Sequence, residues 1–181
     1  MSDAAKRHLI FWSVAILGAA ADLVSKDLVF GSLAAQPGHQ LAVIAGFFTL
    51  RADRNPGTFF GLLGGHNSPL IIFTVLMMAL VIIMFLAPPR EVAVTGLGKL
   101  YAAALALVLA GAAGNLWDRV QLGAVRDFLA FNLAGYPWPT FNLADTWLTL
   151  GIAAYLVATW RAARKDAAEP SDSGEAAARD G

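Results

Sequence analysis

The sequence predicts a mainly α-helical membrane protein with four transmembrane helices and a small extramembrane β-rich element between the first two. Three observations predict this fold class. Of the 181 residues, 57% are hydrophobic and 14% are charged, and the mean hydropathy is +0.60, whereas a soluble domain has roughly 25% charged residues. Four apolar runs approach the length of about 20 residues that a helix needs to cross a membrane. A stretch rich in Gly and Pro separates the first two runs.

The composition also argues against several classes of protein. The formal net charge is zero, so we expect no basic field and no nucleic-acid partner. The absence of cysteine excludes a disulfide framework, thiolate metal ligands and a Cys nucleophile. The histidines at positions 8, 39 and 66 are isolated from one another, so we expect no zinc site, no other metal and no cofactor.

The first span is expected at about residues 9–30. It follows the basic residues Lys6 and Arg7, and the small residues Ala19 to Ala21 come after its apolar core. This pattern also fits a cleavable secretory signal peptide. Because apolar residues continue beyond the possible cleavage site, we expect an uncleaved span. A mature protein that begins at Asp22 would contradict this expectation.

Residues 31–68 are expected to form the β-rich element. Two short β-favouring runs, 41–44 and 46–50, lie between Gly and Pro residues, which is typical of strands joined by loops. The remaining spans are expected at about residues 69–87, 97–117 and 141–160, and a short connection rich in Gly and Pro follows Phe128.

The third span carries small residues on one face. They recur every four positions, a spacing that lets helices approach closely in lipid: Ala102, Ala106, Ala110 and Gly114. We expect this face to provide tight helix packing.

We expect one membrane domain, residues 1–165, and a disordered cytoplasmic tail, residues 166–181, which is polar. Basic residues near the span ends set the orientation of a membrane protein. With four spans, most of them fall on one side, so we expect both termini in the cytoplasm: Lys6, Arg7, Arg90, Lys99, Arg161, Arg164 and Lys165.

Ionisable residues near the first two span ends have structural and functional interpretations. Asp22 and Lys26 are four positions apart, so they either form an ion pair on one helix face or Lys26 extends to the membrane interface. Asn55, Pro56 and Gly57 indicate a turn. The small and apolar residues 58–61 follow directly and would suit an extended peptide or an acyl chain.

A second polar group is predicted at the end of the third helix and the start of the fourth. Gly111, Asn115 and Arg119 are spaced by four, which places an amide and a guanidinium on one face, and Arg119 is also suited to pair with the adjacent Asp118. Asn142, three positions before Asp145, suits an N-cap of the fourth helix, so capping competes with a functional role.

Asp127 and Asp145 are the candidate catalytic residues. A short loop between them can return the chain to the same membrane face, and ionisable residues at membrane spans are usually functional. Two carboxyl groups held close together share a proton, so that one deprotonates water while the other donates to a carbonyl oxygen. This is the chemistry of aspartic peptidases, and its pKa values belong to the pair.

Four motifs in order along the chain resemble those of the lipoprotein signal peptidases (signal peptidase II): DLVSK at 22–26, NPGTFFG at 55–61, GNLWDRVQLGAVRDF at 114–128 and FNLAD at 141–145. The resemblance covers nearly all of the membrane part. It implies an aspartic endopeptidase of the bacterial inner membrane that removes the signal peptide from prolipoproteins. It further implies cleavage on the amino side of a diacylglyceryl-modified cysteine.

The resemblance also implies roles for individual residues. Asp127 and Asp145 correspond to the catalytic pair. The residues that correspond to those holding the pair and the substrate in place are Asn115, Arg119 and Asn142. Asn55 and Gly57 belong to the loop that closes over the site, and Asp22 and Lys26 match the first-helix motif. The β-rich element and the active site are implied to lie near the periplasmic face. Membrane lipids surround such enzymes, globomycin is their expected inhibitor, and we expect a monomer.

Arg126 departs from the family pattern. At this position, directly before the aspartate that corresponds to Asp127, the family mostly has an apolar residue. A cation pointing inward at this position would lower the pKa of Asp127. We therefore expect the Arg126 side chain to point toward water or lipid headgroups.

A competing hypothesis is a small membrane transporter or channel whose Asp and Arg residues line an ion path. It predicts charged residues deeper in the spans and broken helices or internal repeats. Here the charged residues gather near one end of the spans and no repeat is evident.

Overall fold

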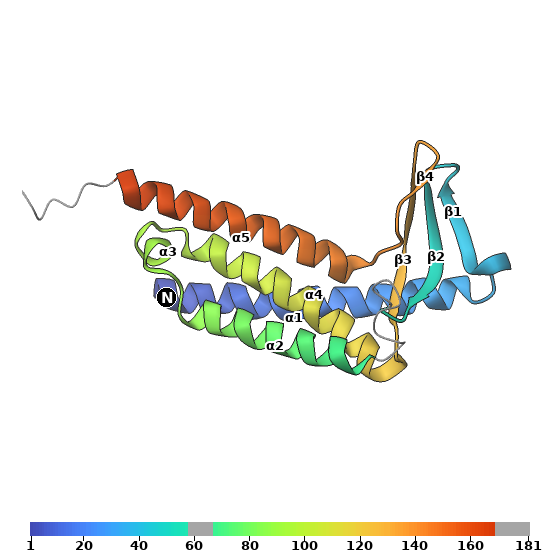
Figure 1. The fold of residues 1–181 in the computed structure, drawn as a ribbon, viewed down its shortest axis with the longest axis horizontal. Coiled ribbons are helices and arrows are strands. Elements are labelled where there is room, and N and C mark those ends of the chain that lie inside the picture. Colours follow the sequence, from blue (N-terminus) through green and yellow to red (C-terminus); the bar gives the residue numbers. More distant parts are fainter. Residues whose placement is uncertain (58–66, 169–181) are drawn as a thin grey trace, which may run out of the picture.

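The computed structural model describes residues 1–57 and 67–168. Its helices are α1 (Asp3–Leu33), α2 (Ser68–Leu86), α3 (Arg90–Val94), α4 (Gly98–Leu122) and α5 (Leu143–Ala168). Among the described residues, all of these except the short α3 are long and apolar enough to cross a membrane. Figure 1 shows the four long helices side by side along the longest axis of the molecule. The mainly helical membrane fold is therefore confirmed.

The helices extend beyond several of the expected bounds. The hydroxyl of Ser2 accepts a hydrogen bond from the N–H of Ala5 at 3.2 Å and caps α1, which then runs without a break through Ala19 to Ala21. At the other end of the chain α5 continues to Ala168, so residues 166–168 are helical rather than part of the tail. The rest of the expected tail lies outside the described residues.

A small antiparallel sheet with the order β1-β2-β3-β4 stands at one end of the helices (Figure 1). Its strands are β1 (Gln40–Ile44), β2 (Phe48–Asn55), β3 (Val125–Leu133) and β4 (Tyr136–Pro137). The first two strands confirm the β-rich element between α1 and α2. The other two lie in the connection between α4 and α5, where the sequence indicated only a loop. The pairing of β2 with β3 places Asn55 opposite Val125.

α4 is the central helix, and its small residues form the expected close contacts. The four residues at every fourth position, Ala102 to Gly114, are buried. A Cβ atom on Gly111 would lie 2.3 Å from the backbone oxygen of Ala144 in α5, and one on Gly114 would lie 2.2 Å from Oδ2 of Asp22 in α1. The glycines therefore bring both helices against α4 at the level of its polar residues.

Candidate active site

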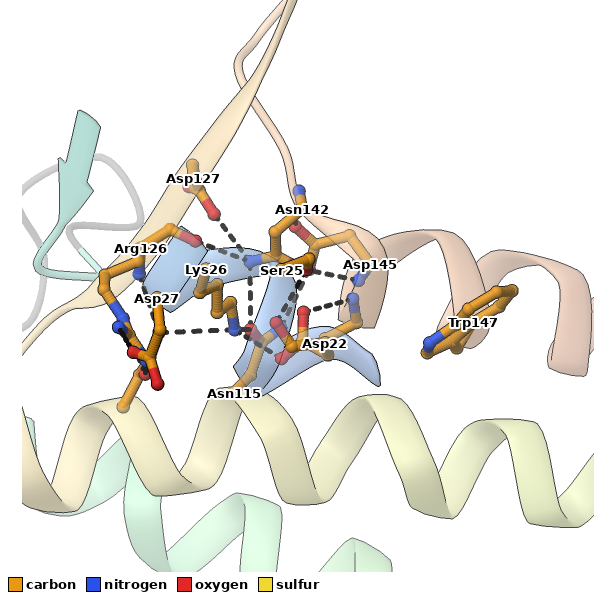
Figure 2. Close-up of polar contacts among 12 residues, drawn as sticks. Asp22, Ser25, Lys26, Asp27, Asn115, Arg126, Asp127, Asn142, Asp145 and Trp147 are labelled. Carbon is orange, nitrogen blue, oxygen red and sulfur yellow. Dashed lines mark hydrogen bonds and ion pairs between the residues drawn. The ribbon is translucent and has the colours of Figure 1, made fainter. Parts of the chain in front are cut away.

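One residue, Asn142, bridges the two candidate catalytic aspartates. Asp127 is on β3, at the sheet, and Asp145 is in the first turn of α5. The side-chain Nδ2 of Asn142 donates to Oδ1 of Asp127 at 2.7 Å, and the backbone N–H of Asn142 donates to Oδ2 of Asp145 at 3.2 Å. Figure 2 shows the three residues close together, with Asp127 on the strand and Asn142 and Asp145 where the chain enters α5. The structure thus brings the two carboxyl groups to one place.

Two further asparagines occupy the remaining carboxyl oxygens. Nδ2 of Asn55, at the end of β2, donates to Oδ2 of Asp127 at 3.1 Å. Nδ2 of Asn115, on α4, donates to Oδ1 of Asp145 at 2.9 Å. Each oxygen of the pair therefore accepts one hydrogen bond from an amide, which fixes the rotation of both carboxyl groups.

The two aspartates have different surroundings. Asp127 is 3% exposed, and burial, together with the charge of Asp145, raises the pKa of Asp127 to about 6, although hydrogen bonds from Asn55 and Asn142 oppose this shift. Asp145 is half-buried and lines a cavity of about 340 Å³. The pair therefore combines a carboxyl group that binds a proton near neutral pH with one that faces an open space.

Lys26 lies behind the pair and fixes the orientation of Asn115. Its side chain is fully buried, and Nζ lies 2.7 Å from Oδ2 of Asp22 and 3.2 Å from Oδ2 of Asp118. Nζ also donates to Oδ1 of Asn115 at 3.1 Å. Because this contact and a second one from Asn142 occupy the Asn115 oxygen, the Asn115 NH₂ group must face Asp145.

The ion pair predicted between Asp22 and Lys26 is therefore present, and Lys26 does not extend to the membrane interface. Asp22 also accepts a hydrogen bond at Oδ1 from the backbone N–H of Ala144 at 2.9 Å. This contact joins α1 to the first turn of α5, directly beside Asp145.

Comparison with known proteins assigns the chain to a family. The family model described as "Signal peptidase (SPase) II" matches residues 14–161. The chain belongs to the signal peptidase II family. A lipoprotein signal peptidase of Desulforapulum autotrophicum is 39% identical over 138 residues, covering 76% of this chain and 83% of the relative. One of Syntrophus aciditrophicus is 42% identical over 122 residues, covering 65% of this chain and 72% of the relative.

A solved structure supports the same assignment. It is described as a bacterial membrane enzyme determined by the in meso method at 1.9 Å resolution, and it matches with a TM-score of 0.67 and 29% identity, covering 82% of this chain and 91% of its own. The family match and the named relatives confirm that this member of the signal peptidase II family is an aspartic peptidase acting as a lipoprotein signal peptidase. They decide against the transporter hypothesis.

The expectation for Arg126 in this signal peptidase II chain is wrong. Arg126 is 9% exposed, and it points neither to water nor to Asp127. Its Nε and Nη2 donate to Oδ1 of Asp118 at 3.1 and 2.8 Å, and its Nη1 pairs with Asp27 (Figure 2). Successive side chains of a strand point to opposite faces, so Arg126 faces the helices while Asp127 faces the other side.

The alternative interpretation, in which Arg119 pairs with Asp118, is not seen in the described residues, because Lys26 and Arg126 occupy Asp118. Arg119 instead donates from Nη1 to the backbone oxygen of Asn115 at 3.4 Å. The sequence alone does not reveal Asp27 or the partners that Asp118 has in the structure. The packing of α1 against α4 brings Lys26 to Asp118, and the start of β3 brings Arg126 to Asp118 and Asp27. No spacing along the chain indicates these contacts.

The turn predicted at Asn55 to Gly57 is present. Oδ1 of Asn55 accepts a hydrogen bond from the N–H of Gly57 at 2.9 Å, and Gly57 has φ +76°, a left-handed conformation that favours glycine. This bond directs Nδ2 of Asn55 toward Asp127. The apolar residues 58–61, expected to lie near the substrate, are outside the described residues.

Proposed function

We propose that Asp127 and Asp145 are the catalytic pair of this lipoprotein signal peptidase. In this proposal the enzyme cuts a prolipoprotein on the amino side of its diacylglyceryl-modified cysteine. The observation that carries the proposal is the position of Asn142, which donates to both carboxyl groups at 2.7 and 3.2 Å. A pair held in this way can share one proton between an acid and a base.

The surroundings of the two carboxyl groups support a division of roles. Asp127, whose pKa is raised to about 6, carries the proton and donates it to the oxygen of the scissile carbonyl. Asp145, which faces the cavity, accepts a proton from a water molecule as the water oxygen bonds to the carbonyl carbon. The tetrahedral intermediate collapses when Asp145 gives its proton to the leaving nitrogen and the carbon–nitrogen bond breaks. One hydroxyl of the intermediate returns its proton to Asp127, which leaves the pair with one proton again.

Arg119 is proposed to position the substrate. Within the described residues its buried Nε has no hydrogen-bond acceptor, and its guanidinium lies close enough to Asp127 and Asp145 to be attracted by both. A backbone carbonyl of the bound peptide would supply the acceptor that Nε lacks. Six further residues hold the two carboxyl groups in place through the contacts described above: Asn55, Gly57, Asn115, Asn142, Asp22 and Lys26.

The cavity beside Asp145 suits an apolar segment of a signal peptide. Its walls include Trp138, Phe141 and Leu150. Thr146 and Thr149 also line it, but their hydroxyl groups donate to the backbone oxygens of Asn142 and Asp145. The cavity is therefore lined mainly by apolar groups, with one carboxyl group at its edge.

The proposal includes the bacterial inner membrane as the site of action, with both termini in the cytoplasm and the sheet at the periplasmic face. The N-terminus and the end of α5 lie at the end of the molecule away from the sheet (Figure 1), and Arg161, Arg164 and Lys165 are near that end of α5. Membrane lipids as surroundings, globomycin as an inhibitor and a monomeric state complete the proposal.

Replacement of each aspartate by asparagine tests the proposed pair. Asp127→Asn and Asp145→Asn should each abolish cleavage of a lipidated prolipoprotein by the purified enzyme, followed by gel mobility and by the mass of the product. Asp53→Asn is the matched control, because Asp53 lies opposite Asp127 in β2 but pairs with Arg51. Normal cleavage by either of the first two variants would show that the pair is wrongly assigned.

A further inference from the structure

Arg126 is buried beside the proposed catalytic pair, yet the mechanism does not use it. Its backbone N–H donates to Oδ2 of Asp118 on α4 at 2.9 Å. Its backbone oxygen accepts from Nδ2 of Asn142 at 3.2 Å. The peptide groups on both sides of Arg126 are therefore held in place, one by Asp118 and one by Asn142. The peptide group that accepts from Asn142 is the one that links Arg126 to Asp127.

The Arg126 side chain adds a second set of contacts to the same helices. Three of its nitrogens bind two carboxylates, Asp118 on α4 and Asp27 on α1. The side chain of Asp118 is fully buried, whereas that of Asp27 is 72% exposed. One guanidinium therefore joins the first residues of β3 to the ends of two membrane helices.

Just beyond the aspartate, a different contact holds the strand. The backbone N–H of Phe128 donates to the backbone oxygen of Phe141 at 3.0 Å. Asp127 therefore lies between an anchor on α1 and α4 and an anchor on the segment that leads into α5. Loosening the first anchor would leave this part of β3 held by the contact with Phe141 and by its pairing with β2.

We propose that Arg126 is a positioning residue that, through its contacts with Asp118 and Asp27, fixes the start of β3 so that the Asp127 carboxyl group meets Asn142. The inference rests on the proposed function of Asp127 and extends it to the residue that precedes Asp127 in β3. Arg126 does not touch the reacting atoms and acts only through the strand.

The geometry of the contacts requires arginine rather than a positive charge alone. A guanidinium presents several donors in one rigid plane and can bind two carboxylates at once, whereas an ammonium group is a compact point charge. Arg126→Lys keeps the charge opposite the buried Asp118 but loses the bridge to Asp27. This variant therefore separates the placement of β3 from the neutralisation of a buried carboxylate.

Steady-state kinetics with a lipidated prolipoprotein test the proposal. Arg126→Lys should lower kcat about tenfold, because small displacements of a catalytic group are costly, while KM stays within about twofold. Asp27→Asn should lower kcat in the same direction but less, since Asp118 retains its contacts. Arg54→Lys is the matched control and should leave both constants unchanged, because Arg54 is exposed and lies opposite Arg126 in β2.

A measurement independent of activity accompanies the kinetics. Amide hydrogen exchange in residues 125–128 should be faster in Arg126→Lys than in the parent and unchanged in Arg54→Lys. Unchanged exchange, an unchanged kcat, or a rise in KM alone would each overturn the positioning role. Asp127→Asn in the same assay reports on the proposed function itself: if that variant cleaves normally, the proposed function fails, whereas the exchange result still decides whether Arg126 anchors β3.

Discussion

Asn142 and Asp145 exchange two hydrogen bonds at the start of α5. The N–H of Asp145 donates to Oδ1 of Asn142 at 2.9 Å, and the N–H of Asn142 donates to Oδ2 of Asp145 at 3.2 Å. This reciprocal arrangement caps the helix, so the capping interpretation of the sequence is confirmed. It does not compete with the proposed catalytic one, because Nδ2 of Asn142 remains free of the cap and donates to Asp127.

Two substitutions of Asn142 separate the cap from the contact with Asp127. Serine can still accept from the N–H of Asp145 but has no Nδ2, whereas alanine loses both functions. We expect both variants to lose activity about 100-fold, because each misplaces the Asp127 carboxyl group. Asn142→Ala should also be less stable than Asn142→Ser by about 1 kcal/mol, the usual contribution of an N-cap. Cleavage kinetics and thermal unfolding in detergent measure the two effects, and full activity of the serine variant would contradict the expectation.

The hydrogen bond from Asn55 to Asp127 predicts a change in pH dependence. Burial raises the pKa of Asp127 to about 6, and the bond from Asn55 opposes this rise because it stabilises the carboxylate. Asn55→Ala should therefore raise the pKa further. Since the proposed mechanism needs the protonated form of Asp127, activity falls as the pH rises through this pKa, and the decline should occur at higher pH in the variant.

The pH profile of kcat/KM measures this shift, because it reports the apparent pKa values of the free enzyme. Thr49→Ala, in the same strand but paired with Ala130, is a suitable control and should leave the profile in place. A shift of the alkaline limb to lower pH in Asn55→Ala would show that the proton is not held on Asp127.

The parts of the fold that sequence could predict are those with a local pattern. The four spans follow from apolar runs, and the close packing on α4 follows from small residues at every fourth position, all of which are buried. The ion pair of Asp22 and Lys26 follows from helical spacing. These features need no information about which segments meet in space.

The features that the sequence did not reveal depend on contacts between distant segments. β3 exists because it pairs with β2, and residues 129–137 taken alone contain the Gly and Pro typical of a loop. The orientation of Arg126 follows from that strand, since alternation along β3 sends it toward Asp118 rather than toward water. The sequence showed a cation before Asp127, but not the buried carboxylate that binds it.

The contact between α4 and α5 predicts that Gly111 tolerates no side chain. A Cβ atom there would lie 2.3 Å from the backbone oxygen of Ala144, which cannot move aside as a flexible side chain would. Gly111→Ala should therefore separate the two helices, lower the free energy of unfolding by about 1–3 kcal/mol and reduce activity by displacing Asp145. Gly31→Ala is the control, because its Cβ would meet nothing within 4 Å. Equal unfolding temperatures for the two variants would contradict this interpretation of the helix contact.

Lys26 offers a test of the buried charges beneath the pair. Its ammonium group is the nearest cation to Asp22 and also contacts Asp118, and all three side chains are fully buried. Removing one partner of a buried ion pair leaves an uncompensated charge and costs about 3–5 kcal/mol. Lys26→Met should therefore lower the free energy of unfolding by that amount. It should also lower cleavage, because Asn115 loses one of the two donors, Lys26 and Asn142, that orient its NH₂ group toward Asp145.

A second substitution shows whether the loss comes from the unpaired charge. Asp22→Asn removes one carboxylate, so Lys26→Met should cost less stability in that background than in the parent, a coupling that unfolding of the four proteins in a double-mutant cycle measures. Activity should not return in the double variant, since Asn115 still lacks the donor from Lys26. Additive losses of stability would mean that the Lys26 ammonium does not compensate Asp22. Recovered cleavage would mean that the contact with Asn142 alone is enough to orient Asn115.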